Sequence, residues 1–75
     1  MQFYFDVRDD FYAFRDTDGL EFPDVETAKN EAIAVATSIA QDVFNAGGSE
    51  VSVTVRDEIR SVLEVTLILK LNDLS

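Results

Sequence analysis

The stretch Pro23-Asp-Val-Glu-Thr-Ala-Lys-Asn-Glu-Ala-Ile-Ala-Val-Ala-Thr-Ser-Ile-Ala-Gln-Asp-Val-Phe-Asn-Ala-Gly-Gly48 decides the fold, because its apolar residues have the periodicity of a helix. They recur at spacings of three and four, which predicts a helix with one buried face. Asp24 is a good N-cap, and Gly47-Gly48 would end the helix after about Ala46. The apolar stripe comprises Val25, Ala28, Ala32, Ala36, Ile39 and Val43, widened by Ile33, Ala40 and Phe44.

The segment before this helix, residues 2–16, alternates apolar and polar side chains and is predicted to form a β-hairpin. A two-residue turn at Asp9-Asp10 would place Val7 opposite Tyr12. Because the buried side of the helix is rich in alanine, large side chains of the hairpin would fill the space between the layers. The residues expected to do so are Phe3, Phe5, Tyr12 and Phe14.

The segment after the helix, residues 50–71, is predicted to form a second hairpin with a three-residue loop at 58–60. Such a loop usually has a left-handed glycine at its third position, which here is Arg60. We therefore expect a strained turn, which Arg60→Gly would relieve by up to ~1 kcal/mol. The loop length pairs Val55 with Leu63, Val53 with Val65 and Val51 with Leu67.

Together these segments predict a single α+β domain over residues 1–75 with the order ββαββ. One long helix would cover one face of an antiparallel-rich four-stranded sheet. The chain has no cysteine, so stability must come from the core and from association with other chains. The first residues do not resemble a signal peptide, and no apolar run is long enough to span a membrane. We therefore expect a cytoplasmic protein.

The charge excludes several kinds of partner. With 15 acidic and 6 basic residues, the formal net charge is −9, which repels phosphate backbones and anionic membrane surfaces. We expect no nucleic-acid partner and no membrane partner, although an acidic protein could mimic nucleic acid at a basic site. Histidine is also absent, which removes the usual proton shuttle and zinc ligand.

Several short motifs resemble, in order and spacing, a family of short bacterial proteins known only as a domain of unknown function. The family pattern is F-D-x-R … G-x-E-x-P-D … E-A … V-R-D-E-x-G-x-V-L. This chain departs from it at Arg60, where the family usually has glycine. The resemblance implies no activity, cofactor or catalytic residue. The residues that carry the resemblance are Phe5-Asp6-Val7-Arg8, Asp18-Gly19-Leu20-Glu21-Phe22-Pro23-Asp24, Glu31-Ala32, Val55-Arg56-Asp57-Glu58 and Val62-Leu63.

The segment from Asp16 to Asp24 has two interpretations. Asp16, Asp18 and Glu21 are weak candidates for a cation site, but calcium needs more oxygen ligands than this set supplies. We prefer the structural interpretation, in which Asp18-Gly19 forms a turn. For Asp6, a salt bridge to Arg8, Arg15 or Arg56 is expected. Carboxylates at exposed turns lack the apolar cleft of a general acid, so we predict a protein that is not an enzyme and has no cofactor.

The carboxyl-terminal strand suggests an interaction surface. It is longer and more apolar than its partner, and an exposed edge strand of this kind invites pairing with another chain. The alternative is that the strand is central, between the two hairpins. We predict a non-catalytic protein-interaction domain that forms a homodimer; the alternative function is small-ligand or cation binding at Asp16–Asp24. The interface candidates are Tyr4, Phe11, Val62, Ile68, Leu69 and Leu71.

Overall fold

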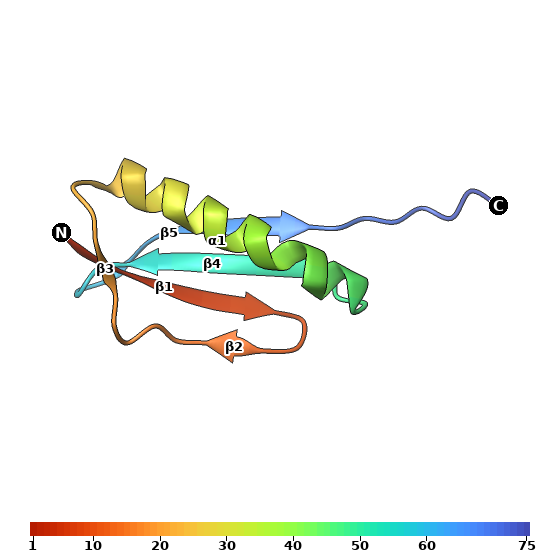
Figure 1. Cartoon of the computed structure of the whole chain (residues 1–75), viewed down its shortest axis with the longest axis horizontal. Helices are drawn as coiled ribbons and strands as arrows, with labels where there is room; N and C mark the ends of the chain where they lie inside the picture. Colours follow the sequence, from red (N-terminus) through yellow and green to blue (C-terminus); the bar gives the residue numbers. More distant parts are fainter.

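The computed structural model describes residues 1–75 and shows one helix packed on one face of a five-stranded sheet (Figure 1). The predicted α+β class is confirmed. The sheet has one strand more than expected, because part of the segment predicted as a loop pairs with the first strand. The elements are β1 (Gln2–Asp9), β2 (Ala13–Phe14), β3 (Leu20–Glu21), α1 (Val25–Asn45), β4 (Glu50–Arg56) and β5 (Ser61–Ile68).

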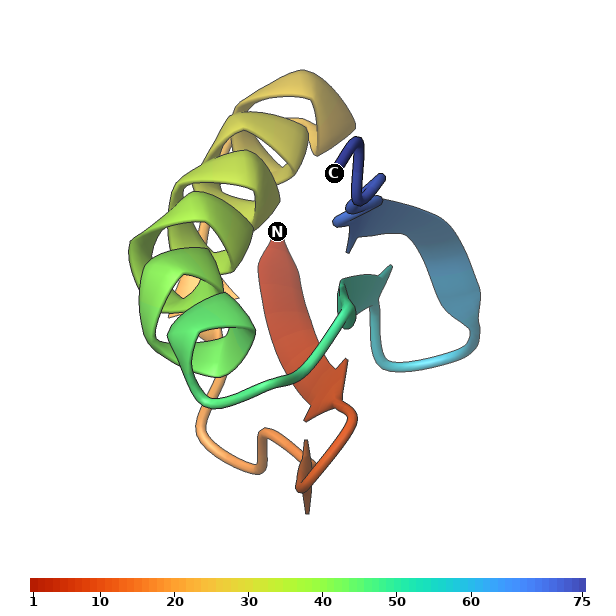
Figure 2. The same ribbon diagram turned by 90° about the vertical axis from the view of Figure 1, so that its right-hand side faces the viewer.

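All strand pairs are antiparallel, and the order is β2-β1-β4-β5. The short strands β2 and β3 share one edge of β1: β2 pairs with Val7 and Arg8, and β3 pairs with Gln2 and Phe3. Figure 2 shows the strands following a curved path from β2 to β5, with the helix on one side. The strand β5 therefore forms a free edge of the sheet. It is not central, and the edge interpretation holds.

Both ends of α1 follow the sequence signals. The Asp24 carboxylate accepts a hydrogen bond from the Thr27 backbone N–H at 2.8 Å. At the other end, Gly47 has a φ of 97°, and the Gly48 N–H donates to the Val43 carbonyl at 2.9 Å. This is the Schellman arrangement, which satisfies carbonyls that the helix leaves unpaired.

The core lies between α1 and the strands β1 and β4. Phe22 was not predicted to belong to it, yet its ring contacts Phe5 edge-on, with 5.8 Å between centroids. Tyr12 and Phe14 were expected in the core, but both are exposed, Phe14 by 61%. Val25 and Ile33, expected on the buried stripe of the helix, are also exposed, by 37% and 42%. The buried apolar residues are Phe3, Phe5, Ala28, Ala32, Ala36, Ala40, Val43, Val51, Val53 and Val55.

The first hairpin turns one residue later than predicted. Asp9 is the first residue of the turn, and its carboxylate accepts hydrogen bonds from the N–H groups of Phe11 and Tyr12 at 2.7 and 2.9 Å. Its own N–H donates to the Tyr12 carbonyl at 2.9 Å. Val7 therefore pairs with Phe14 instead of Tyr12. Aspartate favours this first position because its carboxylate can cap the turn, which a central position would not allow.

The second hairpin has the predicted register, with Val55 opposite Leu63, but its turn is not strained. Asp57 accepts from the N–H groups of Ile59 and Arg60 at 2.8 and 2.9 Å, as Asp9 does in the first turn. No residue other than glycine has a positive φ. The expectation of a left-handed Arg60 is therefore wrong. Instead, the pairing of the two strands shifts at a bulge between Val55 and Arg56, so that Val55 lies opposite Leu63 and Arg56 lies opposite Ser61.

Candidate functional site

The loop after β2 is fastened to β1 by the side chain of Asp16. One carboxylate oxygen accepts a hydrogen bond from the Phe5 N–H at 3.1 Å. The other accepts from the N–H groups of Asp18 and Gly19 at 3.0 and 3.1 Å. Phe5 lies between the stretches of β1 that pair with β2 and β3. Asp16 therefore takes the place of a neighbouring strand at that point.

A second acidic residue, Asp6, connects this loop to β4. Its carboxylate accepts from Nε of Arg56 at 2.8 Å and from the Asp16 N–H at 3.0 Å. Arg56 also donates from Nη2 to the Asp16 carbonyl, and its guanidinium lies 4.5 Å from the centre of the Tyr4 ring. Of the three arginines expected to pair with Asp6, Arg56 is the partner. The pair is largely shielded from water, which makes it a structural contact.

Gly19 allows the loop to lie directly against β1. Its φ is 73°, a conformation that side-chain-bearing residues rarely adopt. A Cβ added there would lie 2.9 Å from the Phe3 carbonyl oxygen and 2.9 Å from a Tyr4 ring carbon. The glycine in the motif around Asp16 is therefore explained by close packing, as the structural interpretation of this segment requires.

The hydrogen bonds at Asp16 also affect its ionisation. Partial burial raises the pKa of Asp16, but hydrogen bonds from Gly19, Phe5 and Asp18, with the charge of Arg56, outweigh that effect. The net pKa lies below the ordinary value. The carboxylate is thus held in its charged form, with its oxygens occupied by backbone donors.

The three weak cation candidates have separate surroundings. Asp16 accepts the backbone hydrogen bonds described above, whereas Glu21 accepts from the Met1 amino group at 2.6 Å. The carbonyl of Asp18, not its carboxylate, accepts from the Gln2 side chain at 2.9 Å. No group of three or more acidic side chains is arranged to hold a metal ion. The main role of Asp16 here is to order the loop.

The six interface candidates do not form one patch within a single chain. Tyr4 lies beneath Arg56, and Phe11 lies in the first turn. Val62 is near the start of β5, whereas Ile68 ends it, 67% exposed. Leu69 and Leu71 follow in an extended tail that continues from β5 beyond the sheet (Figure 1).

The two edges of the sheet differ in how they are covered. The edge of β1 is closed by β2, β3 and the Asp16 carboxylate. The edge of β5 has no neighbour. Its side chains toward the helix are only half-buried, whereas their register partners on β4 are fully buried. The half-buried residues are Leu63, Val65 and Leu67.

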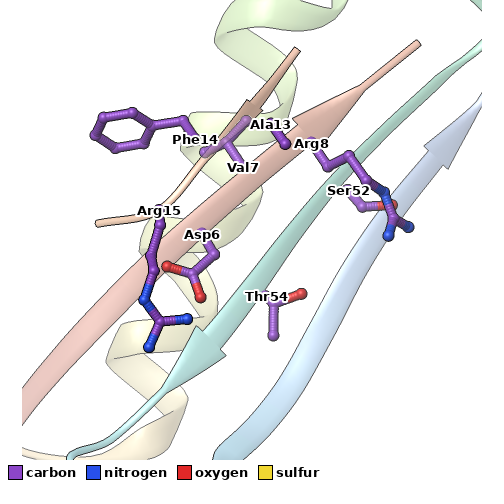
Figure 3. Close-up of a pocket in the computed structure, with 8 residues that line it drawn as sticks. All are labelled: Asp6, Val7, Arg8, Ala13, Phe14, Arg15, Ser52 and Thr54. Atoms are coloured by element: carbon purple, nitrogen blue, oxygen red, sulfur yellow. The ribbon is translucent and has the colours of Figure 1, made fainter. Parts of the chain in front are cut away.

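Two recesses lie near the edge of the sheet that β1 and β2 form. One, of about 320 Å³, runs beside the acidic loop and is lined by apolar residues with Asp16, Asp18 and Glu31 at its margin. The other, of about 300 Å³, lies on the sheet face away from the helix (Figure 3). Sequence reasoning missed this second recess, because strand alternation does not show where the side chains of β1, β2 and β4 leave a hollow. Its lining residues are Asp6, Val7, Arg8, Ala13, Phe14, Arg15, Ser52 and Thr54.

Comparison with known families gives one finding. Residues 2–68 match the family model described as a domain of unknown function, DUF6894. No match was found among curated proteins or among solved structures. The matched region ends where β5 ends. No helix combines the length and the apolar character needed to cross a membrane.

Proposed function

The chain belongs to the DUF6894 family, and we propose that it is a non-catalytic interaction domain that forms a homodimer through the β5 edge. One observation carries this proposal: β5 is a long, uncovered strand at one edge of the sheet, whereas the opposite edge is closed. Natural proteins usually protect such an edge with proline, a bulge, charged side chains or a covering segment. From Leu63 to Ile68, the one such device on β5 is the charge of Glu64. The proposal also includes the expectation from the sequence that this is a bacterial protein of the cytoplasm.

The backbone of β5 determines which residues can pair with a second chain. The Leu69 N–H donates to the Ser49 carbonyl at 2.8 Å, so odd-numbered residues of this strand bond to the β4 side. Because antiparallel pairing alternates, the N–H and C=O groups of Glu64, Thr66 and Ile68 point away from the sheet. These groups are available to another strand.

A second copy of β5 complements this edge well. If the two-fold axis passes through Leu67, Glu64 lies opposite the partner's Lys70, so opposite charges meet. An axis at Glu64 would place two glutamates opposite each other. An axis at Val65 would bring Arg60 beside the partner's Lys70. Charge therefore favours the Leu67 axis.

The same axis also covers the apolar side chains. Toward the helix, it pairs Leu67 with its own copy, Val65 with the partner's Leu69 and Leu63 with the partner's Leu71. Leu71 is 84% exposed in the single chain and would gain most from this contact. Burial of these apolar side chains supplies the driving force that backbone pairing alone lacks.

Sedimentation of the whole chain tests self-association. We expect a dimer whose population rises with concentration. Ile68→Pro should shift the protein to monomer, because it removes an outward N–H without breaking the bonds to β4. Ile68→Ala is the matched control, since it shortens the side chain but keeps the N–H. A strict monomer at every concentration would overturn the proposal.

A cysteine placed at the proposed axis tests the register. The chain has no cysteine, so a single one reports without background. Across non-hydrogen-bonded positions, the two copies of residue 67 would have Cα atoms ~4.5 Å apart, within disulfide range. Leu67→Cys should therefore form a linked dimer under mild oxidation, whereas Val65→Cys should not. Efficient linkage of Val65→Cys instead would place the axis elsewhere.

The ionisation of the acidic residues supports a non-catalytic role. Hydrogen bonds from the backbone N–H groups of Glu50 and Ser49 lower the pKa of Asp10. Hydrogen bonds from the backbone N–H and the hydroxyl group of Thr27 lower the pKa of Asp24. A carboxylic acid that donates a proton near neutral pH needs the opposite shift. Incubation with ester, phosphate-ester and glycoside substrates should therefore give no turnover above buffer.

The recess beside the acidic loop supports a second candidate function, small-ligand binding at the Asp16–Asp24 loop. Its lining combines apolar residues, of which Phe14 and Leu20 are exposed, with the acidic residues Asp16, Asp18 and Glu31. This combination suits an apolar ligand with a positively charged group better than a bare cation. A thermal-denaturation series with alkylammonium salts and with calcium tests both. Unchanged melting with all of them would remove this candidate.

A further inference from the structure

The depression on the open face of the sheet is lined by two basic residues and one acidic residue, in a protein that is otherwise acidic. Figure 3 shows Arg15 and Arg8 at opposite sides of the view, with Asp6 and Thr54 between them. Arg15 forms no ion pair. Arg8 has only Glu50 at 3.9 Å, and its side chain is 63% exposed. Both guanidinium groups thus have free N–H donors.

The one acidic residue that lines the depression cannot neutralise them. Both carboxylate oxygens of Asp6 are occupied, one by Nε of Arg56 and one by the Asp16 N–H. Asp6 and Arg56 form a balanced pair, and Glu50 and Glu64 contact the rim through Arg8 and Thr54. Arg15 is therefore unpaired, and Arg8 is only weakly paired. Their placement is unusual because the whole chain has only 6 basic residues against 15 acidic ones.

The floor of the depression offers hydroxyl oxygens. Thr54 donates its hydroxyl hydrogen to Glu64 at 3.1 Å, so its oxygen remains able to accept a hydrogen bond. Ser52, next to it on the same face, is only 2% exposed, and its hydroxyl lies 3.3 Å from that of Thr66. A ligand that reaches Thr54 can therefore donate a hydrogen bond there.

We propose that this depression binds a small hydroxylated anion, whose carboxylate or phosphate group lies between Arg8 and Arg15 and whose hydroxyl donates to Thr54. The planar guanidinium fork suits both anionic groups. The volume of about 300 Å³ is at the lower end of ligand pockets, which favours a small molecule. The net charge of −9 opposes a polyanion such as nucleic acid. The depression lies on β1, β2 and β4, so the proposal does not depend on self-association through β5.

Titration followed by ¹H–¹⁵N NMR on the full chain tests this site. The probes are inorganic phosphate, acetate and lactate, of which the last two differ by one hydroxyl group. We expect saturable shifts at the Nε–H signals of Arg8 and Arg15 and at the amide of Thr54. Tighter binding of lactate than of acetate supports the hydroxyl contact. Saturation by phosphate alone identifies a phosphate as the anionic group, and saturation by the carboxylates alone identifies a carboxylate.

Charge-matched variants separate a local site from a general effect of charge. Arg15→Gln should weaken binding about tenfold or more, since each charge-assisted hydrogen bond is worth on the order of one factor of ten. Arg15 is exposed and unpaired, so this variant should remain folded, as its spectrum will show. Arg60→Gln removes the same charge at the distant β4–β5 turn and should leave affinity unchanged. Shifts that never saturate, or equal weakening by both variants, would overturn the proposal.

Discussion

Nε of Arg56 donates to Oδ2 of Asp6 at 2.8 Å, diagonally across the β1–β4 pair. The same guanidinium lies over Tyr4 and donates to the Asp16 carbonyl, so one side chain joins two central strands to the loop after β2. Lysine could keep the charge but not the two separate donors or the stacked planar group. The geometry of this contact therefore matters more than its charge.

We predict that Arg56→Lys lowers the free energy of unfolding by about 1–2 kcal/mol, because a partly buried carboxylate and a carbonyl lose their shared donor. Urea denaturation monitored by circular dichroism measures this loss. Arg15→Lys is the control, since Arg15 is exposed and forms no ion pair. Equal stability of the two variants would mean that the Asp6–Arg56 pair contributes only as a surface charge.

The conformation of Gly19 leads to a second prediction. Gly19→Ala should cost about 2 kcal/mol or more, because the left-handed backbone is unfavourable for alanine and the new Cβ would contact the Phe3 carbonyl. Gly47→Ala is a matched control: its φ is also positive, but nothing lies within 4 Å of an added Cβ. Gly47→Ala should cost only about 1 kcal/mol. Similar losses in both variants would mean that the packing against β1 is unimportant.

Those parts of the fold that depend on local signals could be predicted from the sequence. Asp24 and Gly47 mark the two ends of α1, and the strict alternation from Val51 to Val55 determines which residues of β4 join the apolar core. The register of the second hairpin follows from that alternation, because a slip by one residue would expose every valine. The edge position of β5 was one of two alternatives until the strand order was known.

Features that depend on tertiary geometry could not be predicted in this way. The turn at Asp9 was misplaced by one residue, because two adjacent aspartates give the same composition signal. The strand β3 contains only two residues, too few for any periodicity. Which arginine would pair with Asp6 was undetermined, because Arg8, Arg15 and Arg56 share one sheet face. The pairing with Arg56 leaves Arg15 without an ion pair and Arg8 with only Glu50 at 3.9 Å, and the recess lies between these two arginines.

The conformation of Arg60 reverses one sequence-based expectation. Because Arg60 is not left-handed, Arg60→Gly should not relieve strain. It should instead destabilise the chain by ~0.5–1 kcal/mol, since glycine gives the unfolded chain more conformational freedom. Arg60→Ala separates this effect from loss of the side chain, and the glycine variant should be the less stable of the two. If glycine proves more stable than alanine in urea denaturation, the turn is left-handed in solution.

Acid should destabilise the protein through carboxylates that accept backbone hydrogen bonds. The folded-state pKa of Asp16 is lowered, so its contribution is fully present above the unfolded value of about 3.9 and is lost as the pH falls through the folded value. Asp10, Asp24 and Asp57 shift in the same direction for the same reason. The free energy of unfolding should therefore fall steadily as the pH is lowered below about 4.

The variant Asp16→Asn isolates the contribution of Asp16 to this effect. At neutral pH it should lower the free energy of unfolding by about 1–3 kcal/mol, because an amide cannot accept the Phe5 N–H and the bonds from Asp18 and Gly19 at the same time. The difference from the wild type should shrink at low pH, where the protonated wild-type carboxyl group also loses an acceptor. Asp18→Asn makes the same charge change next to Asp16, but the Asp18 carboxylate accepts no hydrogen bond, so it should have little effect at either pH. Urea denaturation at neutral and acid pH measures both variants. A gap between wild type and Asp16→Asn that stays constant with pH would show that the asparagine acts through packing and not through the lost charge.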